Sequence, residues 1–446
     1  MDAHVIDSTL FRNDYSTEAT RKLWSSRSIL QSWLDVEAAL ARAEAAVGMV
    51  PEDAAAEITR VADAELYDLD ALREEMERTA HPIVPVVRAM TALCEDEAGR
   101  WVHWGATTQD ITDTGNILLM KGSLDLIEET LAAVTGEVRR LSKEHRDTVM
   151  AGRTHGQQAL PLTFGFKAAV WLDEVKRHAA RIAEARPRLL VGQFAGAVGT
   201  MASVGEAGPD VQRRMMDDLG LGVPDIVWHA SRDRTAEYAF LLALITGSMG
   251  HIAREVTILQ RSEIAELEEP NPKGKVGSST MPHKRNPHIS ENVGALARLT
   301  RAVVVSALDG VVNENERDWT ALQSEREFLA RLSCHTHAAL VQTLHVLEGL
   351  SVRSANMRRN LDLTGGMLLS EAVMLALGKT LGRQVAHDVV YDACMKAFET
   401  ETTMKAALLA DPQVAEHFDE AAIDALMDPA GYTGLAGAFV DAVTDN

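Results

Sequence analysis

The chain has 446 residues and a formal net charge of −21; 46% of its residues are hydrophobic and 5% are aromatic. The acidic balance argues against nucleic acid or an anionic membrane as the main partner, because both demand a basic surface. The length exceeds the roughly 250–300 residues at which a single core stops growing, and the aliphatic, aromatic-poor composition favours helix packing over sheets. We therefore predict an all-α protein with two or three structural regions.

The cysteines and the N-terminal segment bear on the location of the protein. Cys94, Cys334 and Cys394 lie far apart without a CxxC pair, which is typical of a reduced protein rather than of a disulfide scaffold or a zinc site. The CysHisThrHis run at 334–337 falls in a predicted long helix without carboxylates at ligand spacing, so we expect no metal there. The N-terminus lacks a basic segment followed by an apolar stretch, and we expect a soluble, cytoplasmic protein.

Residues 1–105 form the first predicted region, an N-terminal domain of several helices. SerThrGlu at 16–18 is typical of a helix start. Pro51 and Pro82 interrupt the helical pattern of this region.

The second region, residues 106–351, consists of much longer helical tracts. In one of them Phe240, Leu241, Ile245 and Met249 begin a series of apolar residues at steps of one, three and four, which predicts a buried helical face. Tracts of this length are typical of a bundle of long helices. The predicted tracts cover residues 110–145, 162–186, 234–263 and 289–350, approximately.

A polar loop at residues 269–287 interrupts the long tracts. Four prolines and two glycines oppose regular structure there, and no acidic residue follows Glu269 to balance the cations of the loop. In so acidic a protein, this loop is the natural place for a ligand that carries carboxylates. Long loops in compact domains are usually lids or binding loops. The cations of this loop are Lys273, Lys275, Lys284 and Arg285.

Shorter helices follow the long tracts. The Gly365-Gly366 pair breaks the pattern, and Asp411-Pro412 and Asp428-Pro429 are typical of later turns. We therefore predict a small C-terminal helical domain over residues 352–446.

Several sequence blocks resemble those of one enzyme family. The loop contains GSSTMPHKRNP at 277–287, a close match to the GSSxMPxKxNP signature of the fumarase/aspartase superfamily. Two further blocks of that superfamily occur in the expected order, GATTQDITDT at 105–114 and GRTHGQ at 152–157. With RDRTAE at 232–237 and NLDLTGG at 360–366, the resemblance covers nearly the whole chain.

This resemblance implies a fold, an assembly and a reaction. Such enzymes have an N-terminal helical domain, a central bundle of five long helices and a C-terminal helical domain, and they form homotetramers through the bundles. Their active sites lie where three subunits meet. They cleave a succinyl-type substrate by β-elimination without a metal or redox cofactor. We therefore expect a small anionic dicarboxylate as the partner, fumarate as a product, and no cofactor.

The resemblance also implies catalytic roles. Removing a proton from the carbon next to a carboxylate creates a doubly charged aci-carboxylate, which cations and amide donors must stabilise as it forms. Ser278 would be the general base, while Lys284 and Asn286 would hold the developing charge. Serine is a poor base, so loop closure would have to surround its hydroxyl with backbone amides. His155 would be the general acid or its partner, a duty that suits the neutral-range pKa of histidine.

Other residues of the matched blocks would contact the substrate. Thr107, Thr108 and Gln109 lie at the predicted start of a long helix, where free backbone amides favour anions, although such a run is also typical of a helix cap. His81 resembles a substrate-site histidine of adenylosuccinate lyases, with Pro82 in place of the usual aspartate. The remaining expected substrate contacts are Thr154, Gln157, Ser279, Met281 and Arg326.

The residues point to more than one branch of the superfamily. His81 and the GluArgAsp block at 316–318 resemble adenylosuccinate lyase of purine synthesis. Two departures count against that branch: Asp14 stands where an arginine is expected, and Leu322-Gln323 replaces a pair of serines. Both expected groups normally help to hold the nucleotide phosphate, which an aspartate would repel.

HWGATTQD at 103–110 and VWHASRDR at 227–234 look more like 3-carboxy-cis,cis-muconate cycloisomerases. That branch, however, typically carries tryptophan where this chain has His155. The combination predicts a third possibility, a carbon–nitrogen lyase that acts on a small amino-dicarboxylate or another substituted succinate outside purine synthesis. Because lens crystallins related to argininosuccinate lyase use this fold as structural proteins, a non-catalytic role is the alternative from a different class.

Overall fold

The computed structural model describes residues 4–272 and 274–445, so Lys273 of the polar loop lies outside the described residues. The chain forms two compact units. The first unit contains Met1–Ala132, His178–Gly250 and Asn292–Gln342, and the second contains Ala133–Arg177, His251–Glu291 and Thr343–Asn446. The three regions expected from the sequence divide the chain differently and remain a prediction.

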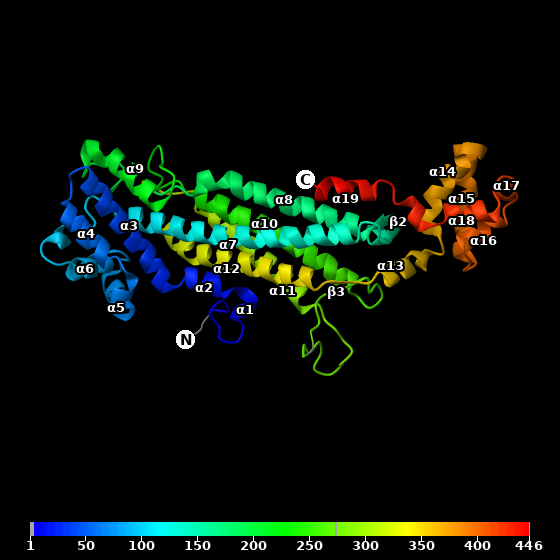
Figure 1. Cartoon of the computed structure of the whole chain (residues 1–446), viewed down its shortest axis with the longest axis horizontal. Helices are drawn as coiled ribbons and strands as arrows, with labels where there is room; N and C mark the ends of the chain where they lie inside the picture. The colour runs from blue at the N-terminus through cyan, green and yellow to red at the C-terminus, as the bar shows by residue number, and fades with distance from the viewer. Residues whose placement is uncertain (1–3, 273, 446) are drawn as a thin grey trace. The chain divides into compact units, whose positions relative to one another are not determined.

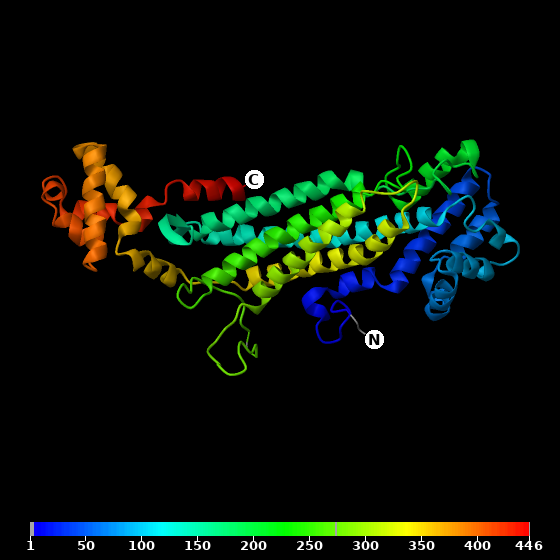
Figure 2. The same ribbon diagram turned by 180° about the vertical axis from the view of Figure 1, so that it is seen from behind.

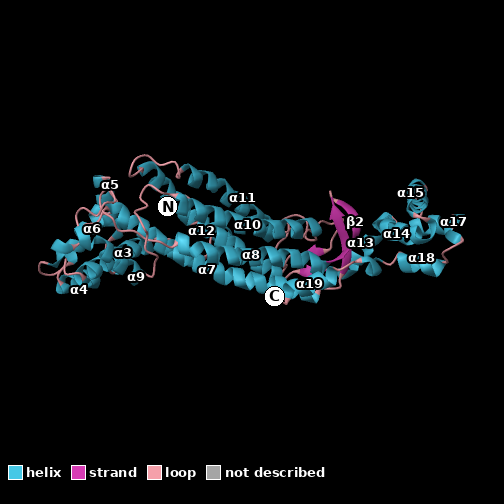
Figure 3. Cartoon of the chain, turned by 90° about the horizontal axis from the view of Figure 1, so that it is seen from above, coloured by secondary structure: helices cyan, strands magenta, loops and turns pink. Residues whose placement is uncertain are grey.

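Helices provide nearly all of the regular structure, as Figure 3 shows by colour. The shorter α-helices of the first unit are α1 (Arg12–Tyr15), α2 (Glu18–Leu23), α3 (Ser26–Ala46), α4 (Glu52–Val61), α5 (Leu69–Thr79), α6 (Val84–Leu93) and α9 (Gly208–Leu219). Those of the second unit are α13 (Ser354–Leu361), α14 (Ser370–Leu381), α15 (Arg383–Glu399), α16 (Met404–Leu409), α17 (Pro412–Ala415), α18 (Glu420–Leu426) and α19 (Ala436–Thr444). Short 3-10 helices are η1 (Ala64–Leu66), η2 (Ala98–Trp101), η3 (Gly205–Ala207), η4 (Asp362–Thr364), η5 (Met367–Leu369) and η6 (Pro429–Tyr432).

Five longer helices, each of 22 residues or more among the described residues, contribute segments to both units (Figure 1). They are α7 (Thr108–Glu144), α8 (Phe164–Leu189), α10 (Asp233–Leu259), α11 (His288–Asp309) and α12 (Trp319–Glu348). In the first unit the Tyr238 hydroxyl on α10 bonds to Ser333 on α12 at 2.7 Å. In the second unit the Lys167 ammonium on α8 donates to Glu255 on α10 at 2.7 Å. Hydrogen bonds thus supplement the apolar packing between the long helices.

Three of the four predicted long tracts match single helices, and the fourth does not. The tract expected over 289–350 is wrong as one helix, because residues 310–318 separate α11 from α12. Gly310 and Asn315 fall in this break, and Asn315 has a φ of +54°, a left-handed conformation that a continuous α-helix excludes. The buried face predicted for α10 is present, except that Phe240 is 55% exposed.

The helices of the N-terminal segment begin where local side chains cap them. The Thr17 hydroxyl accepts the Thr20 amide in a reciprocal capping box, which confirms the helix start predicted at 16–18. The next helices, α3, α4 and α6, enclose an apolar core with Leu34 and Ile58 at its centre. Figure 1 shows α3 alongside α9, and Arg42 of α3 pairs with Asp218 of α9 at 2.6 Å.

Helices α14, α15, α16 and α18 form a small cluster in the second unit, coloured orange to red in Figure 2. Val373, Leu377 and Met404 are fully buried in its core. The predicted break at Gly365-Gly366 is confirmed, since both glycines have positive φ (59° and 88°). A side chain on Gly366 would also collide with the methyl group of Met427.

Among the described helices, α10 is long and apolar enough to cross a membrane, with a mean hydropathy of 1.2 in its most apolar window. The sharply bent pair formed by Ser354–Thr364 and Met367–Leu381 passes the same test only when both helices count as one span. Because 67% of the α10 window is buried inside the protein, its composition is that of a core helix.

His337 shows how the first unit depends on buried polar groups. Its Nδ1 bonds to the Thr17 hydroxyl at 2.8 Å and its Nε2 to the Thr130 hydroxyl at 3.0 Å. Burial lowers the pKa of His337 to about 4. The imidazole therefore stays neutral in the folded protein at a pH where the unfolded chain binds a proton.

We predict that this histidine makes folding stability fall as the pH drops below about 6.5, its ordinary pKa, because only the unfolded chain takes up the proton there. Between pH 7 and pH 5 its contribution to the free energy of unfolding should decrease by about 1–2 kcal/mol. Urea unfolding at both pH values should therefore show a smaller pH dependence for His337→Gln than for the wild type. The control is the exposed His387→Gln; equal pH dependence in both variants would contradict the prediction.

Candidate functional site

The GRTHGQ block forms the tip of a hairpin in the second unit. Strands β1 (Val149–Thr154) and β2 (Gln157–Thr163) pair in antiparallel fashion, a feature that the all-helical prediction missed. His155 and Gly156 make the two-residue turn with φ values of +53° and +77°, the pattern of a type I′ hairpin. A histidine at positive φ is uncommon and costs conformational energy, so the turn fixes this side chain at an exposed position at the expense of strain.

A buried ion pair supports the base of this hairpin. Arg153 donates to both carboxylate oxygens of Glu266, at 2.9 and 2.6 Å. The Asn360 amide donates to the same carboxylate at 2.8 Å, and the Gln158 amide donates to the Asn360 carbonyl at 2.8 Å. Two blocks of the matched sequence pattern, at 152–157 and 360–366, are therefore joined through Glu266. Bidentate geometry of this kind sets orientation as well as adding stability.

The GSSTMPHKRNP segment folds back on itself. The Asn286 amide donates to the Gly277 carbonyl at 2.6 Å, so the two limbs of the segment meet. A side chain on Gly277 would collide with the Lys284 carbonyl oxygen, which explains the glycine at this close approach. Ser278 and Lys284 consequently belong to one small closed loop.

Two backbone amides of the same loop donate to the Ser278 hydroxyl oxygen. Its oxygen accepts the Met281 amide at 3.1 Å and lies 3.4 Å from the Thr280 nitrogen. Hydrogen bonds donated to an oxygen stabilise its deprotonated form more than its neutral form. The arrangement therefore lowers the cost of an alkoxide at this position.

Salt bridges pair most of the described cations of this loop. Lys275 contacts the buried Glu269 carboxylate at 2.8 Å, and Arg285 contacts Glu268 at 2.7 Å. Among residues 269–272 and 274–287, Lys284 is the cation whose side chain forms neither a hydrogen bond nor an ion pair with described residues. An incoming carboxylate would therefore meet Lys284 without having to displace an internal partner.

Residues Thr107–Gln109 form part of a polar cluster at the start of α7 in the first unit. The Asp110 carboxylate accepts the Thr107 amide at 3.0 Å. The ThrThrGlnAsp run at 107–110 therefore also caps the helix. Arg317 donates to the Gln109 side-chain oxygen at 2.8 Å and to the Thr107 hydroxyl at 3.3 Å. The prediction gave Arg317 no role at the site, although it belongs to the GluArgAsp block that the sequence singled out.

Buried charges hold this start of α7 in place. Arg232 is 1% exposed and donates to both oxygens of Asp113, at 2.7 and 3.0 Å, and through Nε to Glu325 at 2.8 Å. Although burial disfavours the guanidinium charge, the two carboxylates raise the pKa of Arg232. One turn earlier, Asp110 accepts His229 Nε2 at 2.8 Å and the Gly196 amide at 2.9 Å. Arg232 lies in the RDRTAE block, but no local sequence pattern indicates its partners.

His81 faces Thr108 across a small cavity. Its Nδ1 accepts the Val84 amide at 3.1 Å, which in a neutral ring places the proton on Nε2. Nε2 then donates to the Thr108 hydroxyl at 3.1 Å. Burial, and then the nearby His103, lower the pKa of His81. His81 thus acts in this site as a neutral hydrogen-bond donor.

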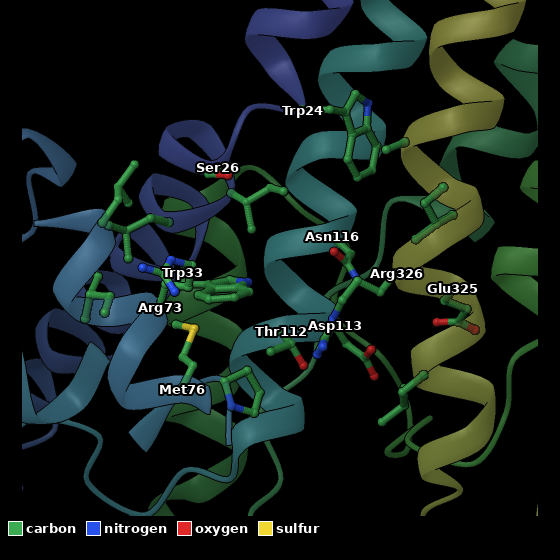
Figure 4. A pocket seen from close by; sticks show the side chains of 18 of the residues that line it. Trp24, Ser26, Trp33, Arg73, Met76, Thr112, Asp113, Asn116, Glu325 and Arg326 are labelled. Atoms are coloured by element: carbon green, nitrogen blue, oxygen red, sulfur yellow. The ribbon is translucent and has the colours of Figure 1, made fainter. Parts of the chain in front are cut away.

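Two neighbouring cavities of the first unit meet at Trp319. The smaller one, of about 250 Å³, is lined by Ala80, His81, Thr108, Gln109, Arg317 and Trp319. The larger one, of about 620 Å³, contains Arg326, the last of the predicted substrate contacts in this unit (Figure 4). Its side chain lies over the Trp319 ring at 5.9 Å.

The predicted site residues therefore fall into three groups, one in the first unit and two in the second. The first unit brings together His81, Thr107, Thr108 and Gln109 beside the cavity that contains Arg326. The second unit holds a hairpin set, Thr154, His155 and Gln157, and a loop set, Ser278, Ser279, Met281, Lys284 and Asn286. No group of three or more metal-binding side chains is positioned to hold an ion among residues 4–272 and 274–445.

Comparison with known proteins extends the resemblance beyond the short matched blocks. Residues 12–301 match the sequence model of the family described as Lyase, and residues 366–443 match the model described as Adenylosuccinate lyase C-terminus. A solved 3-carboxy-cis,cis-muconate lactonizing enzyme from Pseudomonas putida superposes with a TM-score of 0.94 at 38% identity, covering 98% of each chain. The all-α fold predicted from the sequence is thereby confirmed.

Two curated relatives carry different activities in their names. The chain is 43% identical to an N-acetyl-S-(2-succino)cysteine lyase from Dickeya dadantii, over 99% of this chain and 97% of that relative. It is 40% identical to an adenylosuccinate lyase from Methanocaldococcus jannaschii, over 96% of this chain and 94% of that relative.

The Arg232 ion pairs predict a large stability loss on removal of the guanidinium. Arg232→Met should lower the free energy of unfolding by about 3–5 kcal/mol, because Asp113 and Glu325 would remain buried without a counter-charge. As a control, Arg188→Met breaks an exposed pair with Glu237 and should cost about 1 kcal/mol or less. Urea unfolding followed by circular dichroism measures both variants. Equal losses would show that the buried pairs add nothing beyond a surface contact.

Proposed function

Since the chain belongs to the fumarase/aspartase superfamily of lyases, we propose that it releases fumarate from a 2-substituted succinate by β-elimination, with a thiol as the leaving group. The observation that carries the reaction type is the closed loop around Ser278, whose oxygen accepts backbone amides. The thiol is suggested by the relative named N-acetyl-S-(2-succino)cysteine lyase.

The first step of the proposed mechanism is proton transfer to Ser278. The Ser278 oxygen, as alkoxide, removes a proton from C3, the carbon beside the distal carboxylate. The electron pair of the broken C–H bond moves into that carboxylate and makes it an aci-carboxylate with two negative charges. Lys284 and Asn286 supply the positive charge and the amide donor that this species requires. The lack of an internal ion-pair partner for Lys284 among the described residues supports its role.

Departure of the sulfur completes the reaction. The electron pair returns from the aci-carboxylate to form the C2–C3 double bond, the C2–S bond breaks, and the sulfur leaves with the bonding pair. His155 then donates a proton to the thiolate, or assists the group that does so. The hydroxyls of Thr107 and Thr108 supply neutral donors for the substrate carboxylates, and His81 orients Thr108. The Gln109 amide already donates to Asp113 and to the His229 carbonyl, so Gln109 acts by holding Arg317. Atoms and charges balance without any further reactant.

A nucleotide substrate is the second candidate, and it corresponds to carbon–nitrogen cleavage by an adenylosuccinate lyase. The His81–Thr108 contact and the GluArgAsp block favour it. Leu322 weighs against it, because an apolar side chain lines the cavity beside Arg326 where this branch would place serine. Asp14 also weighs against it, since a carboxylate would repel the phosphate.

The cycloisomerase reaction is the third candidate. The muconate lactonizing enzyme from Pseudomonas putida supports it through overall similarity. His155 distinguishes the present chain from that branch, where tryptophan is typical. The cycloisomerase reaction is therefore less favoured, and 3-carboxy-cis,cis-muconate is included among the substrates of the test.

We also propose a homotetramer with active sites built from three subunits. Exposed apolar side chains on α10 and α11 support this assembly, because large apolar patches on soluble proteins usually mark interfaces. They include Phe240, Leu299, Val305 and Leu308.

The proposal is tested by proton NMR of the purified protein with three substrates: N-acetyl-S-(2-succino)cysteine, adenylosuccinate and 3-carboxy-cis,cis-muconate. We expect the fumarate vinyl signal and free N-acetylcysteine from the first, and slow or no turnover of the other two. Ser278→Ala should lower the rate by about 10²–10⁴-fold, the usual contribution of a positioned base. Light scattering on the same sample should give four times the 48.5 kDa chain mass.

Thr280→Ala, in the same loop, is the matched control and should retain activity. Faster release of AMP than of thiol would replace the first candidate with the second. Full activity of Ser278→Ala would overturn the assignment of the base whichever substrate is used.

A further inference from the structure

The larger of the two cavities that meet at Trp319 has apolar walls. Trp33 on α3 and Met76 on α5 line one side, and Trp319 and Leu322 on α12 line the other. Figure 4 shows the Arg326 side chain extending from α12 into the space opposite the helices that carry Trp33 and Met76. The volume of about 620 Å³ suits a ligand of moderate size.

The carboxylates that line this cavity already have cationic partners. Asp113 is held by Arg232 at 2.7 Å, and Arg232 also binds Glu325. Arg73 donates to Glu77 at 3.0 Å and lies 3.7 Å from Asp70. Each of these four carboxylates therefore has a cationic partner within the wall, although the four share two guanidinium groups.

Arg326 differs from these cations. Its guanidinium donates to the neutral Gln323 side chain at 3.1 Å and lies over the Trp319 ring. Within the part of the chain that the structure describes, it has no carboxylate partner. The cavity thus contains one cation that is available to an anionic ligand and is oriented by an aromatic ring.

A polar path along α7 leads into the cavity. Thr108, Thr112 and Asn116 recur at intervals of four residues and so share one face of the helix. Thr108 lines the small cavity with His81, whereas Thr112 and Asn116 line the large one. The eight residues between Thr108 and Asn116 correspond to roughly 12 Å along the helix axis. The Asn116 side chain forms no hydrogen bond with described residues, so its amide is open to a ligand.

We infer that this cavity binds the leaving group and selects an N-acylated amino-acid thiol. The carboxylate of that group would bind Arg326, its amide would bind Asn116, and its acyl and methylene groups would contact Trp33 and Met76. The inference rests on the proposed function, because it assumes that elimination takes place beside Thr108 and His81. It assigns substrate selection to residues outside the catalytic loop.

Other leaving groups fit the same lining less well. A phosphate dianion would find one free guanidinium and the apolar Leu322, although phosphate sites usually provide several donors. A thiol with a free ammonium group would have to give up the water around that charge on entering the apolar cavity. No carboxylate of the lining is without a cationic partner to compensate for this loss, so binding would be unfavourable. Acylation removes that charge and supplies an amide that Asn116 can bind.

The test compares substrates that share the succinyl group and differ in the leaving group. N-acetyl-S-(2-succino)cysteine carries the carboxylate, whereas S-(2-succino)-N-acetylcysteamine lacks it. Arg326→Met should raise KM for the first about 10–100-fold, as loss of one charged hydrogen-bonding partner does, with kcat changed far less. KM for the second should change less than threefold, roughly, because it has no carboxylate to lose. Arg331→Met, one turn further along α12 and outside this cavity, is the control and should leave both constants near the wild-type values.

A binding measurement separates this inference from the reaction. N-acetylmethionine lacks a succinyl group, and its binding can be followed by tryptophan fluorescence because Trp24, Trp33 and Trp319 line the cavity. Binding by the wild type and by Arg331→Met, but not by Arg326→Met, would support the cavity assignment even if no succinyl thioether were cleaved. Equal binding by Arg326→Met, or no binding by the wild type, would overturn it. Equal KM increases for both thioethers would also overturn it.

Discussion

Arg232 connects three helices of the first unit through charges that cannot reach water. It lies at the start of α10, and its guanidinium binds Asp113 on α7 and Glu325 on α12. Removing one partner from such a group leaves a buried charge without compensation, so these helices are held in one relative arrangement. The Gln109 amide donates to the same Asp113 carboxylate at 2.9 Å. The Arg232–Asp113 ion pair therefore also orients Gln109, a predicted substrate contact.

The second unit uses buried carboxylates in a similar way. Glu266 joins the hairpin that carries His155 to the segment around Asn360. Glu269 accepts the Ile289 and Ser290 amides at 3.1 and 3.0 Å, which caps the start of α11, and it also binds Lys275. These contacts fix the ends of the polar loop at residues 269–287. They also engage Lys275, which the sequence alone does not distinguish from Lys284. Lys284 keeps its charge available for substrate, and the distinction between structural and functional cations arises from folding.

The sequence predicted most of the helical architecture because local patterns carry it. Alanine- and leucine-rich tracts gave α7, α8 and α10 within a few residues at most ends, since apolar periodicity and length are local properties. The single helix predicted over 289–350 is wrong because Gly310 and Asn315 interrupt the helical pattern between α11 and α12. The hairpin at 149–163 was missed because an all-helical composition says little about one pair of strands.

The candidate site was predictable where it rests on contiguous blocks, and not where it rests on long-range pairing. The resemblance marked Ser278, Lys284 and His155 from short motifs. The Arg232 pairs join residues 119 and 93 positions apart, which no local pattern specifies. The apolar cavity around Arg326 likewise combines α3, α5, α7 and α12, and only the folded chain shows that Leu322 and Met76 belong to one surface.

The central claim is that the protein moves a proton at C3 while it makes or breaks the bond at C2. The most direct measurement runs the reaction backwards, with fumarate and N-acetylcysteine in deuterated water, and follows the product by proton NMR. The account predicts a succinyl thioether with one deuterium at one methylene position, formed by the wild type and not by Ser278→Ala. A product with deuterium scrambled over both methylene positions, or equal addition by the wild type and Ser278→Ala, would contradict it.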